Sequence, residues 1–71
     1  AGPLYLAVRE VLTEILENPG SRRVRQHRYR PDTWAVTVRS GDVRWLVLWR
    51  PADSDPDLIE VHHVGPAPGE P

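Results

Sequence analysis

Hydrophobic side chains occupy at least every second position along residues 34–39 (WAVTVR) and residues 43–50 (VRWLVLWR). A period of two is typical of half-buried β-strands. The residues between the two runs contain glycine, so we predict a tight turn that joins them into a β-hairpin. A loop of even length places all three tryptophans of the chain on one face and leaves Arg39 and Arg44 on the other.

The turn can be centred in two ways, and the two differ in how the arginines meet. With Ser40-Gly41 at the centre, Arg39 lies opposite Asp42. With Gly41-Asp42 at the centre, Arg39 lies opposite Arg44. Two like charges in directly opposed positions destabilise a hairpin unless an anion lies between them. The second register would therefore indicate an anion site, whereas a solvated outer face is the alternative interpretation of the same arginines.

A helical pattern precedes the hairpin, because hydrophobic residues recur every three or four positions between residues 4 and 17. Pro3 suits the first helical position. Asn18-Pro19-Gly20 ends the helix, since proline disfavours helical geometry in the residue before it. We expect this helix to lie across the tryptophan face of the hairpin. Its hydrophobic positions are Leu4, Val8, Val11, Leu12, Ile15 and Leu16.

A third strand is predicted over residues 58–64 (LIEVHHV), after an acidic loop. Regular alternation puts Ile59, Val61 and His63 on one face and Leu58, Glu60, His62 and Val64 on the other. The first set is the more uniformly hydrophobic, so we expect it to face the helix. Glu60 and His62 would then share a face with the two hairpin arginines.

These elements predict an α+β fold in which one amphipathic N-terminal helix packs on a three-stranded antiparallel sheet, in the order α-β-β-β. We expect a single domain over residues 1–65 and a disordered tail over residues 66–71, where the chain has nothing to bury. No stretch is hydrophobic enough to span a bilayer, so we expect no membrane association and a cytoplasmic location.

The net charge of −1 conceals three blocks of unequal charge. Residues 1–20 carry one arginine and three glutamates, residues 21–50 carry eight arginines and two aspartates, and residues 51–71 carry five carboxylates and no arginine. A cationic middle of this kind suggests a polyanion or an acidic protein as partner. All basic side chains are arginines, which make forked contacts to phosphate and stack on bases.

Residues 21–31 (SRRVRQHRYRP) form a basic run with interleaved aromatic side chains. Single-stranded nucleic acids are bound by such combinations, since arginine contacts phosphates and aromatic rings stack on bases. The alternative is a solvated connector that offsets the acidic segments. With the hairpin arginines, the candidate nucleic-acid-binding residues are Arg22, Arg23, Arg25, Arg28, Tyr29, Arg30, Arg39 and Arg44.

His62 and His63 are the only other side chains that suggest chemistry. Neighbours in a strand point to opposite sides, and no third ligand falls at metal-binding spacing, so we expect no metal and no cofactor. His62 is the better candidate for proton transfer, because histidine changes its protonation near neutral pH. His63 is expected to have a structural role. Nucleotide-binding loops and nucleophile elbows are absent from the sequence.

The order of these motifs resembles the RelE/ParE family of toxins from type II toxin–antitoxin systems. The matching pieces are a helix that ends in Asn18-Pro19, the strand 34–39, the segment 40–45 (SGDVRW) and a last strand that closes on Val64-Gly65. The family's ribonucleases carry lysines where this chain has Ala35 and Thr37.

The resemblance implies a small toxin that cleaves mRNA on the ribosome or, in the ParE branch, poisons DNA gyrase, and that an antitoxin protein neutralises. Arg44 matches the sheet arginine that faces the RNA in the ribonuclease branch. For cleavage we expect His62 or Glu60 to transfer the proton, and Arg39 and Arg44 to bind the phosphate.

Two alternatives stay open. One is a non-catalytic module that binds nucleic acid or an acidic protein. The other is a homodimer or docking domain that pairs through Leu46 and Leu48.

Overall fold

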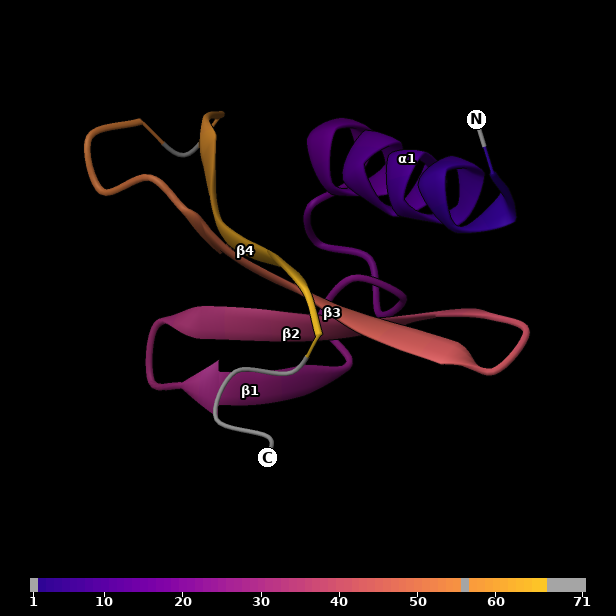
Figure 1. Ribbon diagram of the computed structural model, residues 1–71. Coiled ribbons are helices and arrows are strands. Elements are labelled where there is room, and N and C mark those ends of the chain that lie inside the picture. Colours follow the sequence, from indigo (N-terminus) through magenta and orange to yellow (C-terminus); the bar gives the residue numbers. More distant parts are fainter. Residues whose placement is uncertain (1, 56, 67–71) are drawn as a thin grey trace.

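The predicted helix and hairpin are both present, and a fourth strand extends the sheet (Figure 1). The computed structural model describes residues 2–55 and 57–66. The sheet is antiparallel, with the strands in sequence order from edge to edge. The α+β class is confirmed, whereas the expectation of three strands is wrong. The elements are α1 (Pro3–Glu17), β1 (His27–Arg30), β2 (Thr33–Ser40), β3 (Val43–Pro51) and β4 (Ile59–Gly65).

Helix α1 begins and ends close to the predicted positions. Pro3 occupies the first turn, where its missing N–H costs no hydrogen bond. The helix ends at Glu17, and the N–H of Asn18 donates to the carbonyl of Glu14 at 2.7 Å. Val8 and Ile15 are its buried residues. No helix in the described residues is long and apolar enough to cross a bilayer.

Strand β1 lies inside the basic run, where the sequence predicts no strand. It pairs with β2 through a short turn at Pro31 and Asp32, so that His27 lies opposite Ala35 and Arg30 opposite Thr33. All four residues of β1 are exposed, and no hydrophobic alternation marks the strand. The strand was missed because a solvated edge strand needs no buried side.

The β2–β3 hairpin takes the second of the two possible registers. Ser40 pairs with Val43, Gly41-Asp42 forms the loop, and Arg39 lies directly opposite Arg44. Gly41 has φ +58°, and no other residue of the loop has a positive φ, which is the pattern of a type II′ turn. This turn matches the right-handed twist of the flanking strands.

Alanine at position 41 should therefore weaken the hairpin, because a Cβ disfavours the left-handed region. We expect Gly41→Ala to lower the free energy of unfolding by about 1 kcal/mol. Urea titration followed by circular dichroism measures the change. Gly20→Ala is the matched control, since Gly20 has no positive φ and open space around its Cα. Equal effects of the two substitutions would contradict the assigned turn.

Strand β4 departs from regular alternation at a β-bulge. Val61 pairs with Trp49, but His63 pairs with Leu48, so that His62 is the extra residue between them. The predicted faces hold from Ile59 to His62 and are wrong for His63 and Val64. Beyond the bulge, His63 shares the face of Leu48, and Val64 shares the face of Val47.

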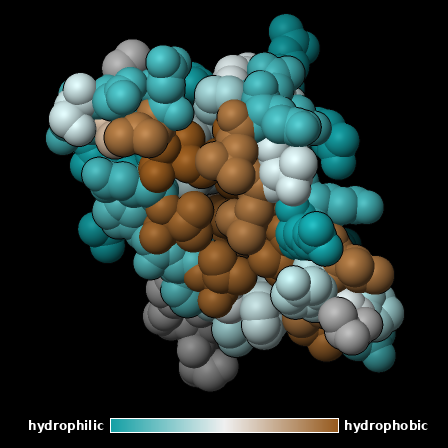
Figure 2. Space-filling view, turned by 90° about the horizontal axis from the view of Figure 1, so that it is seen from above, coloured by the Kyte–Doolittle hydropathy of each residue, from teal (hydrophilic) through white to brown (hydrophobic). Residues whose placement is uncertain are grey.

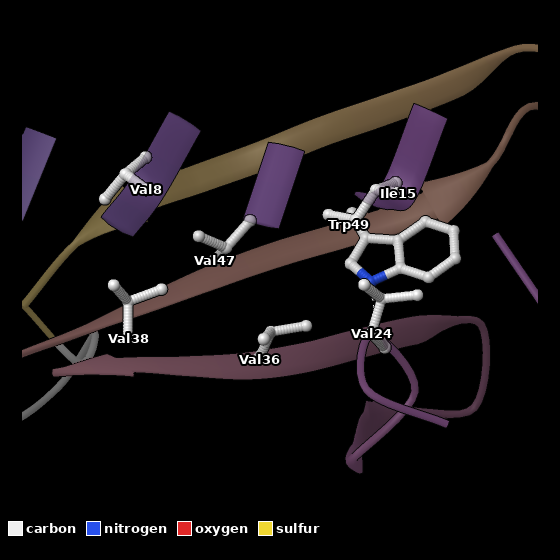
Figure 3. Packing of buried hydrophobic residues seen from close by; sticks show 7 residues of the cluster. All are labelled: Val8, Ile15, Val24, Val36, Val38, Val47 and Trp49. Carbon is white, nitrogen blue, oxygen red and sulfur yellow. Dashed lines mark hydrogen bonds between the residues drawn. The ribbon is translucent and has the colours of Figure 1, made fainter. Parts of the chain in front are cut away.

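The hydrophobic core lies between α1 and the tryptophan face of the hairpin, as predicted. In Figure 3 the side chain of Ile15 lies beside Trp49 and Val24, while Val8 lies at the other end of the cluster near Val38. The indole Nε1–H of Trp49 donates to the carbonyl of Val24 at 2.7 Å, which ties the segment before β1 to the core. The cluster consists of Val8, Ile15, Val24, Val36, Val38, Val47 and Trp49.

The expected domain boundary is only partly covered by the structure. Pro66 is described, and its carbonyl accepts a hydrogen bond from the Nε2–H of His63 at 2.7 Å. The rest of the predicted tail, residues 67–71, lies outside the described residues.

Candidate nucleic-acid interface on the distal face

The sheet face turned away from α1, here called the distal face, carries the residues with chemical potential. Strand parity places Arg39 and Arg44 on this face, together with Leu46 and Leu48. The face is not flat, because Leu48 is only 5% exposed although α1 does not cover it. The edge strands β1 and β4 line the same cavity on this face, so the sheet must be strongly coiled.

Leu48 is consequently unavailable for the predicted dimer contact. Leu46, the other residue of that prediction, is half-buried beside Gly65. The expectation that these two leucines form a free hydrophobic surface is wrong.

Arg39 and Arg44 form a pair of guanidinium groups at one end of the distal face. Both side chains are exposed, and with the turn residues between them they line a surface depression of about 390 Å³. No ion pair to either guanidinium occurs in the part of the chain that the structure describes. Asp42 also lines this depression but forms no ion pair with either arginine. The two opposed cations therefore favour the binding of an anion such as phosphate.

A second site, the histidine pocket, lies toward the other end of the distal face. Its volume is about 270 Å³. All four strands contribute to it: Leu48 from β3 and the buried Thr33 from β2 lie between the two edge strands. The pocket is lined by Tyr29, Arg30, Thr33, Leu48, His62 and His63.

The bulge in β4 brings two neighbouring histidines into this one pocket. The Nε2–H of His62 donates to Oε1 of Glu60 at 3.0 Å. The Nε2–H of His63 donates to the carbonyl of Pro66 at 2.7 Å. In the neutral form each ring therefore keeps Nδ1 as its acceptor. Pairing with a carboxylate fixes the tautomer and orientation of an imidazole, which is what a proton acceptor requires.

The predicted catalytic set is only partly brought together. His62 and Glu60 are in contact, but Arg44 lies four residues along β3 from Leu48, which corresponds to about 13 Å. Strand β4 ends opposite Leu46, so it does not reach Arg44. Arg30, on the opposite edge strand β1, is the arginine that lines the histidine pocket.

The arginines of the basic run that are predicted to bind nucleic acid lie in different surroundings, and two of them pack on tryptophan rings. The guanidinium carbon of Arg28 lies 4.5 Å from the ring centroid of Trp34, and that of Arg25 lies 5.2 Å from the same ring and 5.8 Å from Trp49. Arg25 also donates to the carbonyl of Pro19 at 2.7 Å. These two arginines cover the edge of the core, so they stabilise the fold.

The remaining residues of that run divide between the two sides of the molecule. Arg23 forms an ion pair with Glu14 of α1 at 3.6 Å, and Arg22 is exposed. Tyr29 and Arg30 belong to the histidine pocket, where the guanidinium carbon lies 5.6 Å from the phenol ring centroid. Only these two residues of the run therefore share a site with His62.

Sequence reasoning missed the contributions of Thr33, Leu48 and His63 to the pocket. Leu48 and Thr33 have no chemical signature, and they reach the pocket only because the sheet is coiled. A bulge could have been suspected at His62-His63, since an adjacent polar pair interrupts the alternation of β4. Arg50, which the sequence does not distinguish from the other arginines, forms ion pairs with Asp32 (3.2 Å) and Asp53.

Among residues 2–55 and 57–66, no three histidine or carboxylate side chains are placed to hold a metal ion. Comparison with known proteins found no matching family model, curated protein or solved structure. A functional assignment therefore depends on the geometry of the distal face.

Proposed function

We propose that the protein is an RNA-directed toxin of the RelE/ParE type, which binds a single strand along the distal face and cleaves it at the histidine pocket. The observation that carries this proposal is the opposition of Arg39 and Arg44, neither of which forms an ion pair among the described residues. Such a pair suits a phosphate of the nucleic-acid backbone. The histidine pocket on the same face supports it, because it offers acid–base groups beside an arginine.

The proposed reaction is attack of a ribose 2′-oxygen on the adjacent phosphorus. Nδ1 of His62 takes the proton of the 2′-hydroxyl, the bond from phosphorus to the 5′-oxygen breaks, and that oxygen receives a proton from solvent. The products are a 2′,3′-cyclic phosphate and a 5′-hydroxyl. Arg30 lies in the pocket and stabilises the negative charge that develops on the phosphate. Glu60 orients His62.

Tyr29 gives the pocket a stacking surface for a base. Its ring is exposed and belongs to the edge strand β1, where an unpaired base can approach without obstruction. Stacking on an aromatic ring contributes about 1–3 kcal/mol per base and tolerates any sequence. Substrate recognition would accordingly depend on a single-stranded conformation, as in an mRNA on the ribosome. The antitoxin that neutralises toxins of this type is the protein partner that the proposal includes.

A non-catalytic nucleic-acid-binding module is the second candidate. The separation of about 13 Å between Arg44 and the histidine pocket favours it, since the strongest cationic pair does not lie beside the acid–base groups. Both candidates predict RNA binding, and only the first predicts a cyclic phosphate product.

Arg39→Ala and Arg44→Ala test the RNA-binding step that the two candidates share. Each substitution is expected to weaken binding of a single-stranded RNA by at least about tenfold, since a hydrogen bond to a charged group contributes about 1.5–3 kcal/mol. The slope of log K against log salt should fall by about 0.7 for each arginine removed. Fluorescence anisotropy with a labelled oligonucleotide, repeated at several salt concentrations, measures both quantities.

Arg9→Ala is the matched control, because Arg9 is an exposed arginine on α1, on the other side of the sheet. It makes the same change of net charge and should leave affinity and salt slope nearly unaltered. Equal losses in all three variants would show that only overall charge matters, and this would remove the distal face as the binding surface.

A further inference from the structure

An uncovered hydrophobic strip runs along the α1 side of the sheet, opposite to the distal face. Figure 2 shows it as a continuous band down the middle of the surface seen from above. Its exposed members come from α1 and from β4. In α1, Leu16 is 67% exposed, and in β4, Val61 is 44% exposed. The strip consists of Tyr5, Leu16, Val61 and Val64, with the half-buried Leu12 and Ile59 between them.

The strip exists because one helix covers only half of the sheet. Helix α1 packs chiefly against β2. The side of the helix that carries Glu14 faces the part of the sheet nearest β1, and Glu14 lines a small cavity there together with Val24 and Val36. The other side of the helix faces β3 and β4. It carries Tyr5, Leu12 and Leu16, which are spaced by seven and four residues and therefore share one face of the helix. That side of α1 and the row of β4 side chains thus form the two walls of the strip.

We propose that the strip is a docking site for an amphipathic helix of a second protein. Four strands spaced about 4.8 Å apart make a sheet about 19 Å wide, and a helix with its side chains is about 10 Å wide. The sheet therefore has room for one more helix beside α1. From Tyr5 to Leu16 the exposed wall of α1 is about 16 Å long, which matches three turns of a partner helix.

The helix of a second copy fits the strip poorly. The only helix of the described residues already uses its hydrophobic side against its own sheet. The side that α1 turns outward is polar, so it could not fill the strip of another copy without burying charges that have no partners. That outward side carries Arg9, Glu10, Thr13 and Glu17.

Charge favours one orientation of the partner helix. The C-terminal end of α1 lies at the Trp49 end of the core, toward the loop before β4, which carries Asp55 and Asp57. Asp53 in the same loop is neutralised by its ion pair with Arg50. The last turn of α1 contains no basic residue, so this end of the strip is negative. A partner helix that runs antiparallel to α1 places its positive N-terminal end there. Basic residues at that end of the partner would strengthen the contact.

A designed peptide tests the site directly. We would use a labelled helical peptide of about 18 residues with leucines three and four positions apart, and a second peptide of the same composition with the leucines distributed around the helix. Fluorescence anisotropy is expected to give a dissociation constant of about 1–100 µM for the first peptide and at least tenfold weaker binding for the second. The first peptide begins with three lysines, which match the negative end of the strip. Replacing these lysines by glutamates should weaken the binding of this peptide to the protein.

Leu16→Glu and Val61→Glu should each weaken the first peptide at least about tenfold, because a charge replaces a buried contact. Leu6→Glu is the matched control, since Leu6 is 52% exposed on the polar side of the same helix. It should change the affinity less than twofold. Circular dichroism establishes that all three variants stay folded.

Three results would overturn the proposal. The first is equal binding of the two peptides, and the second is an equal effect of Leu6→Glu and Leu16→Glu. The third is a dimer in sedimentation equilibrium that Leu16→Glu dissociates and Leu6→Glu does not, which would assign the strip to a second copy. The proposal does not depend on the RNA-directed function, because the strip and the distal face lie on opposite sides of the sheet.

Discussion

Replacing Trp49 by alanine is expected to lower the free energy of unfolding by about 3–5 kcal/mol, which is most of the stability of so small a domain. The indole is fully buried between α1 and the sheet. Its removal leaves a cavity that the surrounding valines and Ile15 cannot fill. It also leaves the carbonyl of Val24 without its donor.

Trp49→Phe separates the two effects, because it keeps most of the ring volume and loses the N–H. We expect a loss of about 1–3 kcal/mol from the unsatisfied carbonyl. Urea unfolding monitored by circular dichroism measures both variants. Trp45→Phe is the control, since Trp45 is only half-buried at the far end of the hairpin. If Trp49→Phe were no more destabilising than Trp45→Phe, the hydrogen bond to Val24 would have no measurable role.

His62→Ala is expected to reduce RNA cleavage by about 10²–10⁴-fold, the usual contribution of a positioned proton acceptor. RNA affinity should stay close to that of the unaltered protein, because binding is assigned chiefly to Arg39 and Arg44. The measurement is the yield of 2′,3′-cyclic phosphate from mRNA, with and without translating ribosomes. Glu60→Gln should give a smaller loss, since the amide still accepts the hydrogen bond that orients His62.

His27→Ala is the matched control for His62→Ala. His27 is an exposed histidine at the start of β1 and does not line the histidine pocket. Its replacement should leave cleavage unchanged. Cleavage by His62→Ala at the unaltered rate would remove this ring from the mechanism, and absence of cleavage by every preparation would favour the non-catalytic binding module.

The hairpin and helix follow from sequence pattern because each buries one side. Alternation identified the tryptophan face, and loop parity restricted the turn to two registers. The choice between those registers could not be made from charge, because the opposition of Arg39 and Arg44 looks unfavourable in sequence. The conformation of Gly41 outweighs that repulsion, since a type II′ turn needs a glycine at its first central position.

Strand β1 and the histidine pocket could not be predicted, and the reasons differ. A strand whose residues are all exposed has no hydrophobic period to detect. The pocket depends on coiling of the sheet and on the bulge at His62, and both are tertiary features. The basic run illustrates the same limit, because nothing in its composition distinguishes Arg28, which packs on Trp34, from Arg30, which lines the pocket.

The bulge in β4 also affects how this surface can change during evolution. His62 is one residue in excess of regular pairing, so deletion of a single codon there would restore an uninterrupted ladder with β3. Only the imidazole of His63 would then remain in the cavity, although every other side chain of the protein would be unchanged. Loss of one codon at this point of the gene would thus remove the proposed proton acceptor and the bulge that holds it in a single step.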